Sequence, residues 1–280
     1  MILVADSGSS KTDWRLILSE DKFEQFQSEG LNPNFHSKDS IQEVLKETFV
    51  DVSLISKVSE LHFYGAGCSS NESKVELKKA FNEFFPSAKV CVEHDLLGAA
   101  RAACGHQAAL AGILGTGSNC CVFDGTQIIN SFPSGGYVIG DEGGGVQIGQ
   151  MILKSYIEGY MPEELRERFD FRYKLSIEDI LDNLYKKPYP NRFLAGFSRF
   201  AYQHKEDEFI TELLLKVFGS FFDQKVLRFS EANQLPLNLV GSIAYYYEEY
   251  IKAVAVAKGV TIGTILEKPI AGLALYHLYK

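Results

Sequence analysis

Residues 2–29, ILVADSGSSKTDWRLILSEDKFEQFQSE, have a counterpart in residues 108–136, AALAGILGTGSNCCVFDGTQIINSFPSGG. Each segment begins with a short apolar run that ends in a loop of small and hydroxyl residues. Each then continues with two further runs typical of β-strands, separated by a short polar turn. The turns are Asp21-Lys22 in the first segment and Asp124-Gly125 in the second. An internal duplication of this kind is stronger evidence for the architecture than either loop alone.

The pattern around the first segment predicts the order βββαβαβα. The predicted strands cover 2–6, 13–20, 22–29, 60–67 and 89–95, and the predicted helices cover 37–50, 71–85 and 96–105. After the second segment, residues 142–235 read as mostly helical. A late strand, LNLVG at 237–241, leads into a glycine turn and a helix that reach residue 247, and the segment 261–279 ends in an apolar helix.

Length, composition and charge are those of an ordinary globular protein. The 280 residues, 46% hydrophobic and 23% charged, suggest two domains or one large one. A formal net charge of −8 argues against a nucleic-acid partner. Because there is no long apolar run and no signal-peptide pattern, we expect a cytoplasmic protein with no membrane partner. The five cysteines lack a C-x-x-C pair, which favours reduced and mostly buried thiols.

The loop of the first segment, DSGSSKT at 6–12, has the composition of a phosphate-binding loop. Small residues such as Gly8 allow backbone N–H groups to approach a phosphate, and Ser10 and Lys11 add a hydroxyl and a positive charge. Asp6 ends an apolar strand, where a carboxylate must be hydrogen-bonded, paired or close to a metal such as Mg²⁺. The alternatives are a polar β-turn for the loop and a capped turn carboxylate for Asp6.

The loop of the second segment, GTGSN at 115–119, fails the dinucleotide pattern G-x-G-x-x-G because Cys120 stands at the last glycine. Two such loops, one in each repeat, would be able to clamp a polyphosphate from two sides of a cleft. The duplication therefore favours a phosphate-binding function over a purely structural one.

Three further positions are candidates for ligand binding. Asp95 follows a strand and opens a helix, where it would serve as an N-cap, as a general base, or as both. GGYVIGDEGGG at 135–145 has a glycine density that suggests close approach to a ligand, with Asp141 or Glu142 binding hydroxyl groups. Asn34 lies in a loop, and its amide alone is weak evidence.

Taken together, these motifs resemble the N-acetylglucosamine kinases, which belong with the BadF/BadG-type ATPases in the sugar kinase–actin–heat-shock ATPase superfamily. The resemblance covers nearly the whole chain, and GTGSNC followed by GDEGG is its most telling pair. The motifs that carry it are DSGSSKTDW, GLNPNF, YGAGC, EHDLLGAARA, ILGTGSNC, GGYVIGDEGG, RFLAGFSR, LVGSIA and PIAGLAL.

The resemblance implies an α/β fold of duplicated ribonuclease-H-like domains, with βββαβα repeats and an interdomain cleft. The expected N-terminal domain covers 1–105 plus 265–280, and the expected C-terminal domain covers 106–264 with helical insertions. The implied reaction is phosphorylation of N-acetylglucosamine to its 6-phosphate, with ATP and Mg²⁺, and a homodimer is the default expectation for an oligomer.

The resemblance also implies roles for individual residues. Asp95 would be the catalytic base, and Asp6 would face the metal. The nucleotide would be bound by Asp6, Gly8, Ser10, Lys11, Thr116, Gly117, Ala195 and Gly241. The sugar would be bound by Asn34, Gly67, Asp95, Ser118, Asn119, Gly136 and Asp141.

Other functions stay open at this point. If the protein is a kinase, N-acetylmuramic acid and glucosamine are alternative acceptors to N-acetylglucosamine. A non-kinase member of the superfamily would be a sugar-sensing ATPase or an electron-transfer activator ATPase. The presence of Asp95 argues against a sensor that has lost its base, and the spacing of the cysteines argues against an activator with an iron–sulfur cluster.

Overall fold

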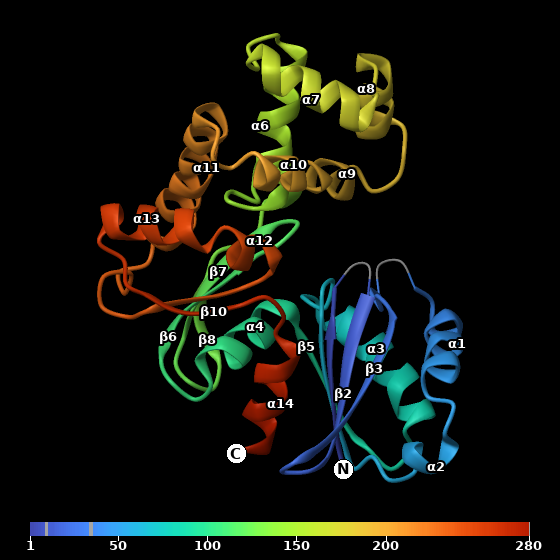
Figure 1. The fold of residues 1–280 in the computed structure, drawn as a ribbon. Helices are drawn as coiled ribbons and strands as arrows, with labels where there is room; N and C mark the ends of the chain where they lie inside the picture. Colours follow the sequence, from blue (N-terminus) through green and yellow to red (C-terminus); the bar gives the residue numbers. More distant parts are fainter. Residues whose placement is uncertain (9–10, 34–35, 280) are drawn as a thin grey trace. The chain divides into compact units, whose positions relative to one another are not determined.

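The computed structural model describes residues 1–8, 11–33 and 36–279, with only the backbone at Val52. The chain divides into two compact units (Figure 1). Unit 1 comprises Met1–Ala108, Phe123–Ile128 and the C-terminal segment from Lys268, and unit 2 comprises Ala109–Val122 and Ile129–Glu267.

Unit 1 is built on a five-stranded sheet in the order β3-β2-β1-β4-β5. The strands are β1 (Ile2–Ser7), β2 (Lys11–Ser19), β3 (Lys22–Glu29), β4 (Glu60–Gly65) and β5 (Lys89–His94). β1, β2 and β3 form an antiparallel meander, whereas β1, β4 and β5 run parallel. The carboxyl ends of the three parallel strands therefore lie along one edge of the sheet, where α/β proteins usually bind ligands.

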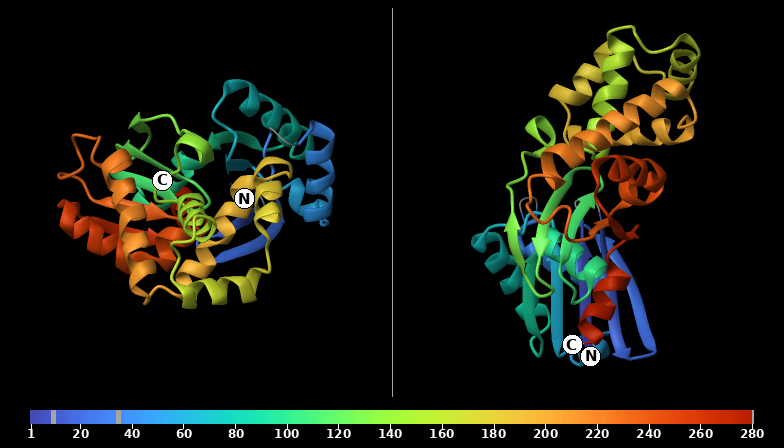
Figure 2. Two further views of the ribbon diagram at one scale, coloured as in Figure 1. Left: turned by 90° about the horizontal axis from the view of Figure 1, so that it is seen from above. Right: turned by 90° about the vertical axis from the view of Figure 1, so that its left-hand side faces the viewer.

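Helices cover both faces of this sheet. The bounds are α1 (Lys38–Thr48), α2 (Val52–Ile55), α3 (Asn71–Phe84), α4 (Asp95–Cys104) and α14 (Ile270–Leu278). Leu3 and Ala5 belong to an apolar cluster that includes residues of α1 and α3. On the other face, α4 packs against α14, and Figure 2 shows α14, in red, beside the blue strands. The predicted order βββαβαβα is confirmed, and the one-turn helix α2 is an addition to it.

Unit 2 repeats the sheet. Its strands are β6 (Ala109–Leu114), β7 (Ser118–Phe123), β8 (Ile128–Ser131), β9 (Leu237–Val240) and β10 (Ile262–Leu266). Their order, β10-β9-β6-β7-β8, is that of unit 1 when the two sheets are read from the matching edge. β9 runs parallel to both β6 and β10. The duplication expected from sequence is thus confirmed, whereas β10 was not predicted because its half-exposed residues follow no clear alternation.

The remaining helices belong to unit 2. They are α5 (Gly136–Ile139), α6 (Gly145–Ile157), α7 (Glu163–Tyr173), α8 (Ile177–Tyr185), α9 (Pro190–Gly196), α10 (Ser198–Gln203), α11 (Glu208–Phe221), the π-helix η1 (Phe222–Val226), α12 (Ser242–Tyr246) and α13 (Glu248–Lys258). A single apolar cluster joins the sheet to most of these helices. The mostly helical character predicted for 142–235 is confirmed.

Two general expectations can also be compared with the structure. All five cysteines are free thiols, and four of them are buried, which confirms the interpretation from sequence. No helix in the stretches that the structure describes is long and apolar enough to cross a membrane.

Helix α6 approaches α9 closely because glycine stands at the contact. A Cβ at Gly149 would lie 1.9 Å from the carbonyl oxygen of Leu194, and a Cβ at Gly145 would lie 3.2 Å from the Cβ of Ala195. The spacing i, i+4 places both glycines on one face of α6. This contact positions Ala195 against the start of α6.

We expect Gly149→Ala to lower the free energy of unfolding by about 1–3 kcal/mol, because the added methyl group overpacks this crossing. Gly219→Ala is the matched control, since a Cβ at this position in α11 meets open space. It should stabilise the protein by about 0.5–1 kcal/mol through helix propensity. Urea denaturation of both variants measures the two effects, and equal values would contradict the packing argument.

Candidate functional site

In unit 1, three carboxylates, those of Asp6, Asp13 and Asp95, lie along the edge of the sheet where the parallel strands end. Asp6 is the second-last residue of β1, and Asp13 of β2 pairs with it in antiparallel register. Burial, and after it the negative charges of Asp95 and Asp13, raise the pKa of Asp6 to about 7. Lys11 opposes this effect only weakly. The group therefore has a strong electrostatic demand for a cation or a proton.

The turn between β1 and β2 is closed by short hydrogen bonds. The Gly8 N–H donates to the Lys11 carbonyl oxygen at 3.0 Å. The Lys11 ammonium pairs with Asp13 at 3.0 Å, although about half of its side chain is exposed. Ser10, predicted to bind phosphate, lies outside the described residues. This bond brings Gly8 and Lys11 together where β1 ends and β2 begins, close to Asp6 in the chain.

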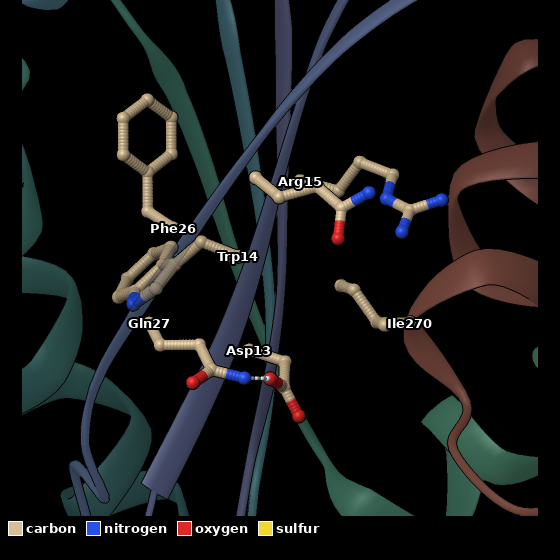
Figure 3. A pocket seen from close by; sticks show the side chains of 7 residues that line it. Asp13, Trp14, Arg15, Phe26, Gln27 and Ile270 are labelled. Atoms are coloured by element: carbon tan, nitrogen blue, oxygen red, sulfur yellow. Dashed lines mark hydrogen bonds between the residues drawn. The ribbon is translucent and has the colours of Figure 1, made fainter.

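Asp13 was not singled out from sequence, although the antiparallel meander predicted there would place it opposite Asp6. Its Oδ1 accepts a hydrogen bond from Gln27 Nε2 at 2.7 Å. Asp13 and Gln27 line a hollow of about 230 Å³ together with Arg15, Ile270 and three neighbours (Figure 3).

Asp95 is the first residue of α4, directly after β5. Its Oδ1 accepts a hydrogen bond from the Leu96 N–H at 2.9 Å. The expectation that Asp95 would be the N-cap is wrong, because His94 occupies that position and accepts from the Leu97 N–H at 3.3 Å. Burial raises the pKa of Asp95, and the hydrogen bond from Leu96 lowers it. The carboxylate is thus free of the capping role.

Gly67 lies in the loop after β4 with a left-handed backbone, φ +82°. A Cβ there would lie 2.3 Å from Oδ1 of Asn32, a buried residue. The loop therefore packs directly on Asn32. Asn34, the amide predicted to bind sugar, lies outside the described residues.

In unit 2, the loop 115–117 is held by its carbonyl groups. The Gly145 N–H donates to the Gly115 oxygen at 2.8 Å, and the Val146 N–H donates to the Thr116 oxygen at 2.9 Å. The N–H groups of Thr116 and Gly117 have no acceptor among the residues that can be described. The start of α6 thus binds the loop while two donors of the loop stay available.

Asp141 packs against this loop in an unusual conformation. Its φ is +60°, a region that side chains other than glycine rarely adopt. Its Oδ1 accepts from the Ser118 N–H at 3.1 Å, and a Cβ at Gly117 would lie 2.5 Å from the same oxygen. Burial raises the pKa of Asp141. The buried Ser118 hydroxyl has no hydrogen-bond partner among the described residues.

The other predicted residues of unit 2 lie on either side of this group. Gly241 has φ +125°, and its Cα faces the Leu114 oxygen, so a Cβ would lie 2.3 Å from that atom. Asn119 turns its Oδ1 to its neighbour, the Cys120 N–H. Gly136 donates its N–H to the Ser134 hydroxyl at 3.2 Å. Thr116, Gly117, Ser118, Asp141, Gly241 and Ala195 are therefore brought to one end of the unit 2 sheet.

Lys225 has no signal in the sequence. It lies on η1 and forms an ion pair with Glu142 at 3.0 Å, with both side chains largely buried. Sequence periodicity would not place a lysine in this position, because a helical lysine usually faces solvent.

The two sheets of identical strand order define a duplicated ribonuclease-H-like α/β fold, which actin-like ATPases and sugar kinases share. A putative N-acetylglucosamine kinase from Porphyromonas gingivalis is 40% identical to the chain over 99% of both proteins, with a TM-score of 0.93. The chain belongs to the N-acetylglucosamine kinase-like proteins of the BadF/BadG-type ATPase family, a family of sugar kinases and related ATPases.

More distant structures share the fold. A putative N-acetylglucosamine kinase from Chromobacterium violaceum is 17% identical over 98% of both chains, with a TM-score of 0.70. A ROK family glucokinase from Streptomyces griseus, in complex with glucose and AMPPNP, is 13% identical over 98% of this chain and 97% of its own, with a TM-score of 0.58. No family model and no curated protein matches the sequence.

The raised pKa of Asp6 predicts a pH dependence of stability. A carboxyl group whose pKa rises from 3.8 to about 7 on folding stabilises the protein below pH 3.8, and this stabilisation is lost as the pH rises to about 7. We expect Asp6→Asn to be more stable than the wild type at pH 8, by about 1–4 kcal/mol, and to lose this advantage towards pH 4.

Asp124→Asn is the control with the opposite sign. The Gln127 and Thr126 N–H groups lower the pKa of Asp124, so its difference from the wild type should change only below the ordinary carboxyl pKa, about 4. Chemical denaturation at several pH values measures both variants. A constant difference between Asp6→Asn and the wild type from pH 4 to 8 would disprove the assignment.

Proposed function

We propose that this protein transfers the γ-phosphoryl group of ATP to an amino sugar, N-acetylglucosamine, and forms its 6-phosphate. The observation that carries the proposal is the 40% identity to a putative N-acetylglucosamine kinase over the full chain. The carboxylates of unit 1 and the phosphate-type loop of unit 2 supply the groups that such a transfer requires.

The loop 115–117 is proposed to bind phosphates of ATP. Its support is the pair of N–H donors at Thr116 and Gly117 that other parts of the chain leave unused. Backbone N–H groups that point in a common direction stabilise anions at no reorganisation cost during the reaction. Gly241 lies beside Leu114 and Gly115, Ala195 lies against Gly145 at the start of α6, and both are proposed to border the adenosine.

Asp6 is proposed to face Mg²⁺, with Gly8, Ser10 and Lys11 at the phosphates. The donor set fits a magnesium ion, which is usually held by one or two carboxylates together with substrate phosphates and water. The carboxylate charges that raise the pKa of Asp6 are the charges that a divalent cation would neutralise. When bound, the ion would supply charge stabilisation to the transferring phosphoryl group.

Asp95 is proposed to be the general base that accepts the proton of the attacking hydroxyl. Its pKa is raised by burial, which brings a carboxylate closer to the range where proton transfer is efficient at neutral pH. Such assistance accounts for about 10²–10⁴ in rate, and the larger part comes from positioning and charge stabilisation.

The sugar is proposed to contact Asn34, Gly67, Asp95, Ser118, Asn119, Gly136 and Asp141. The best structural support is at Ser118 and Asp141. The Ser118 hydroxyl is buried without a partner in the described structure, and the Asp141 carboxylate has capacity for further hydrogen bonds beyond the one from the Ser118 N–H. A sugar bears several hydroxyl groups that would satisfy both.

The decisive experiment is to measure ADP release from Mg²⁺-ATP with N-acetylglucosamine, N-acetylmuramic acid, glucosamine and N-acetylmannosamine, and to identify products by mass spectrometry. Stoichiometric ADP and a phosphorylated N-acetylglucosamine are expected. Turnover with a different sugar would identify that sugar as the acceptor in place of N-acetylglucosamine. A slow ATPase that no sugar stimulates would instead favour a sugar sensor or an activator ATPase.

Asp95→Asn should lower kcat by about 10²–10⁴ and preserve sugar binding, because the amide keeps the shape but accepts no proton. Isothermal titration with the sugar checks binding, and single-turnover assays check the chemistry. Glu93→Gln is the matched control, since this carboxylate lies near the end of β5, two residues before Asp95, and pairs with Lys74. Near-normal turnover of Asp95→Asn would remove Asp95 from the role of base.

A further inference from the structure

The turn that carries Asp141 is anchored by the junction between α11 and η1. Asp141 has φ +60°, which residues other than glycine rarely adopt, and Gly143 has φ +82°, which glycine adopts readily, so the unusual conformation of Asp141 requires support. Within the turn, the Gly144 N–H donates to the Asp141 carbonyl oxygen at 3.0 Å, and the Gly143 N–H donates to Gln147 at 2.7 Å. These contacts are local, and the Ser118 N–H bond to Asp141 ties the turn to the loop 115–118.

Two further contacts hold the turn from its other side, and both come from the α11–η1 junction. Phe221, the last residue of α11, lies against Gly143, where a Cβ would be 2.5 Å from the Phe221 Cβ. Four residues later, Lys225 forms its ion pair with Glu142, which directly follows Asp141. Lys225 is only 8% exposed and Val226 beside it is fully buried. A lysine is rarely buried to this extent unless its charge is compensated.

The ion pair also faces Asp141 electrostatically. The charged groups acting on Asp141 are Lys225 from η1, which lowers its pKa, and Glu142 from its own turn, which raises it. The π-helical segment matters because one additional residue in the turn changes the direction of the side chains that follow, and such segments often occur at functional sites.

We propose that Lys225 is a positioning residue for sugar binding, which through its ion pair with Glu142 holds the Asp141 carboxylate against the loop 115–118. The inference rests on the proposed function, because it assigns Asp141 to the sugar. Lys225 itself does not contact the substrate. Its effect on the reaction passes through the geometry and ionisation of Asp141.

The test compares Lys225→Met and Glu142→Gln by titrating N-acetylglucosamine calorimetrically between pH 5 and 8.5. Both variants should weaken sugar binding at neutral pH by about tenfold to a hundredfold, as expected when hydrogen bonds to a charged group are misplaced. The KM for ATP should change much less than the KM for the sugar.

The pH dependence separates positioning from simple destabilisation. Sugar binding requires the ionised Asp141, so it weakens as the pH falls through the pKa of Asp141. Without Lys225 that pKa rises, and the loss of binding moves to higher pH. With Glu142→Gln that pKa falls, and the loss of binding moves to lower pH. General loosening of the fold would shift both variants in the same direction.

Lys258→Met is the matched control. Lys258 pairs with Asp223 of the same π-helix at 2.6 Å, but Asp223 is exposed and Lys258 is only half-buried. Sugar affinity should stay within about twofold of wild type because pairs near the surface contribute little. Unchanged sugar affinity in folded Lys225→Met, or shifts of the same sign in both variants, would overturn the proposal. If Lys225→Met fails to fold, Glu142→Gln tests the proposal alone: loss of sugar binding at a lower pH than in the wild type supports it, and loss at a higher pH overturns it.

Turnover of the wild-type protein tests the proposed function separately. A wild type that phosphorylates N-acetylglucosamine, with variants that bind this sugar as the wild type does, would refute the role of Lys225 and leave the function in place. A wild type that neither binds nor phosphorylates an amino sugar would refute both.

Discussion

The close approach of two backbone segments in unit 2 determines most of the geometry around the loop 115–117. The first N–H groups of α6 bind the carbonyl oxygens of Gly115 and Thr116, and this requires glycine at the contacts because a Cβ at Gly144 would lie 2.8 Å from the Gly117 carbonyl carbon. The unpaired donors at a helix start are normally satisfied by a side-chain cap. Here the loop itself provides the acceptors, so its own N–H groups remain available. This arrangement accounts for Gly144 and Gly145, the last two glycines of the segment 135–145.

Unit 1 positions its polar groups by a different means. The buried hydroxyls of Ser7 and Thr12 are hydrogen-bonded at 2.8 Å, and the Leu31 N–H donates to Ser7 at 3.0 Å. These bonds link the end of β1 and the start of β2 to the chain after β3, and they hold Ser7 and Thr12 in place next to Gly8 and Lys11. The buried carboxylates, by contrast, destabilise the folded protein when they are ionised. Burial of Asp6 beside Asp95 and Asp13 costs folding free energy once Asp6 is ionised, and natural proteins keep such costs mainly at functional sites.

The sequence predicts the features that depend on local pattern. Alternation and the duplicated loops predict the chain order of the elements in unit 1 and the first three strands of unit 2, and the small-residue segments point to Gly117, Ser118 and Asp141. What it does not predict depends on contacts between distant segments. β10 follows no clear alternation because much of it is exposed, and Lys225 pairs with Glu142 across 83 positions of the chain (225 − 142). His94 displaced Asp95 from the N-cap because an imidazole nitrogen also accepts a hydrogen bond, a choice that residue preferences alone disfavour.

The carboxylates of unit 1 also link ligand binding to protons. With a pKa of about 7, Asp6 is partly protonated at neutral pH, and the charge of Asp95 is a principal reason after burial. Any cation that binds Asp6 must displace that proton, so its apparent affinity falls as the pH falls. The same cation screens Asp6 from Asp95 and relieves the repulsion between them. Cation binding at Asp6 would therefore offset part of the free energy that burial of these carboxylates costs on folding.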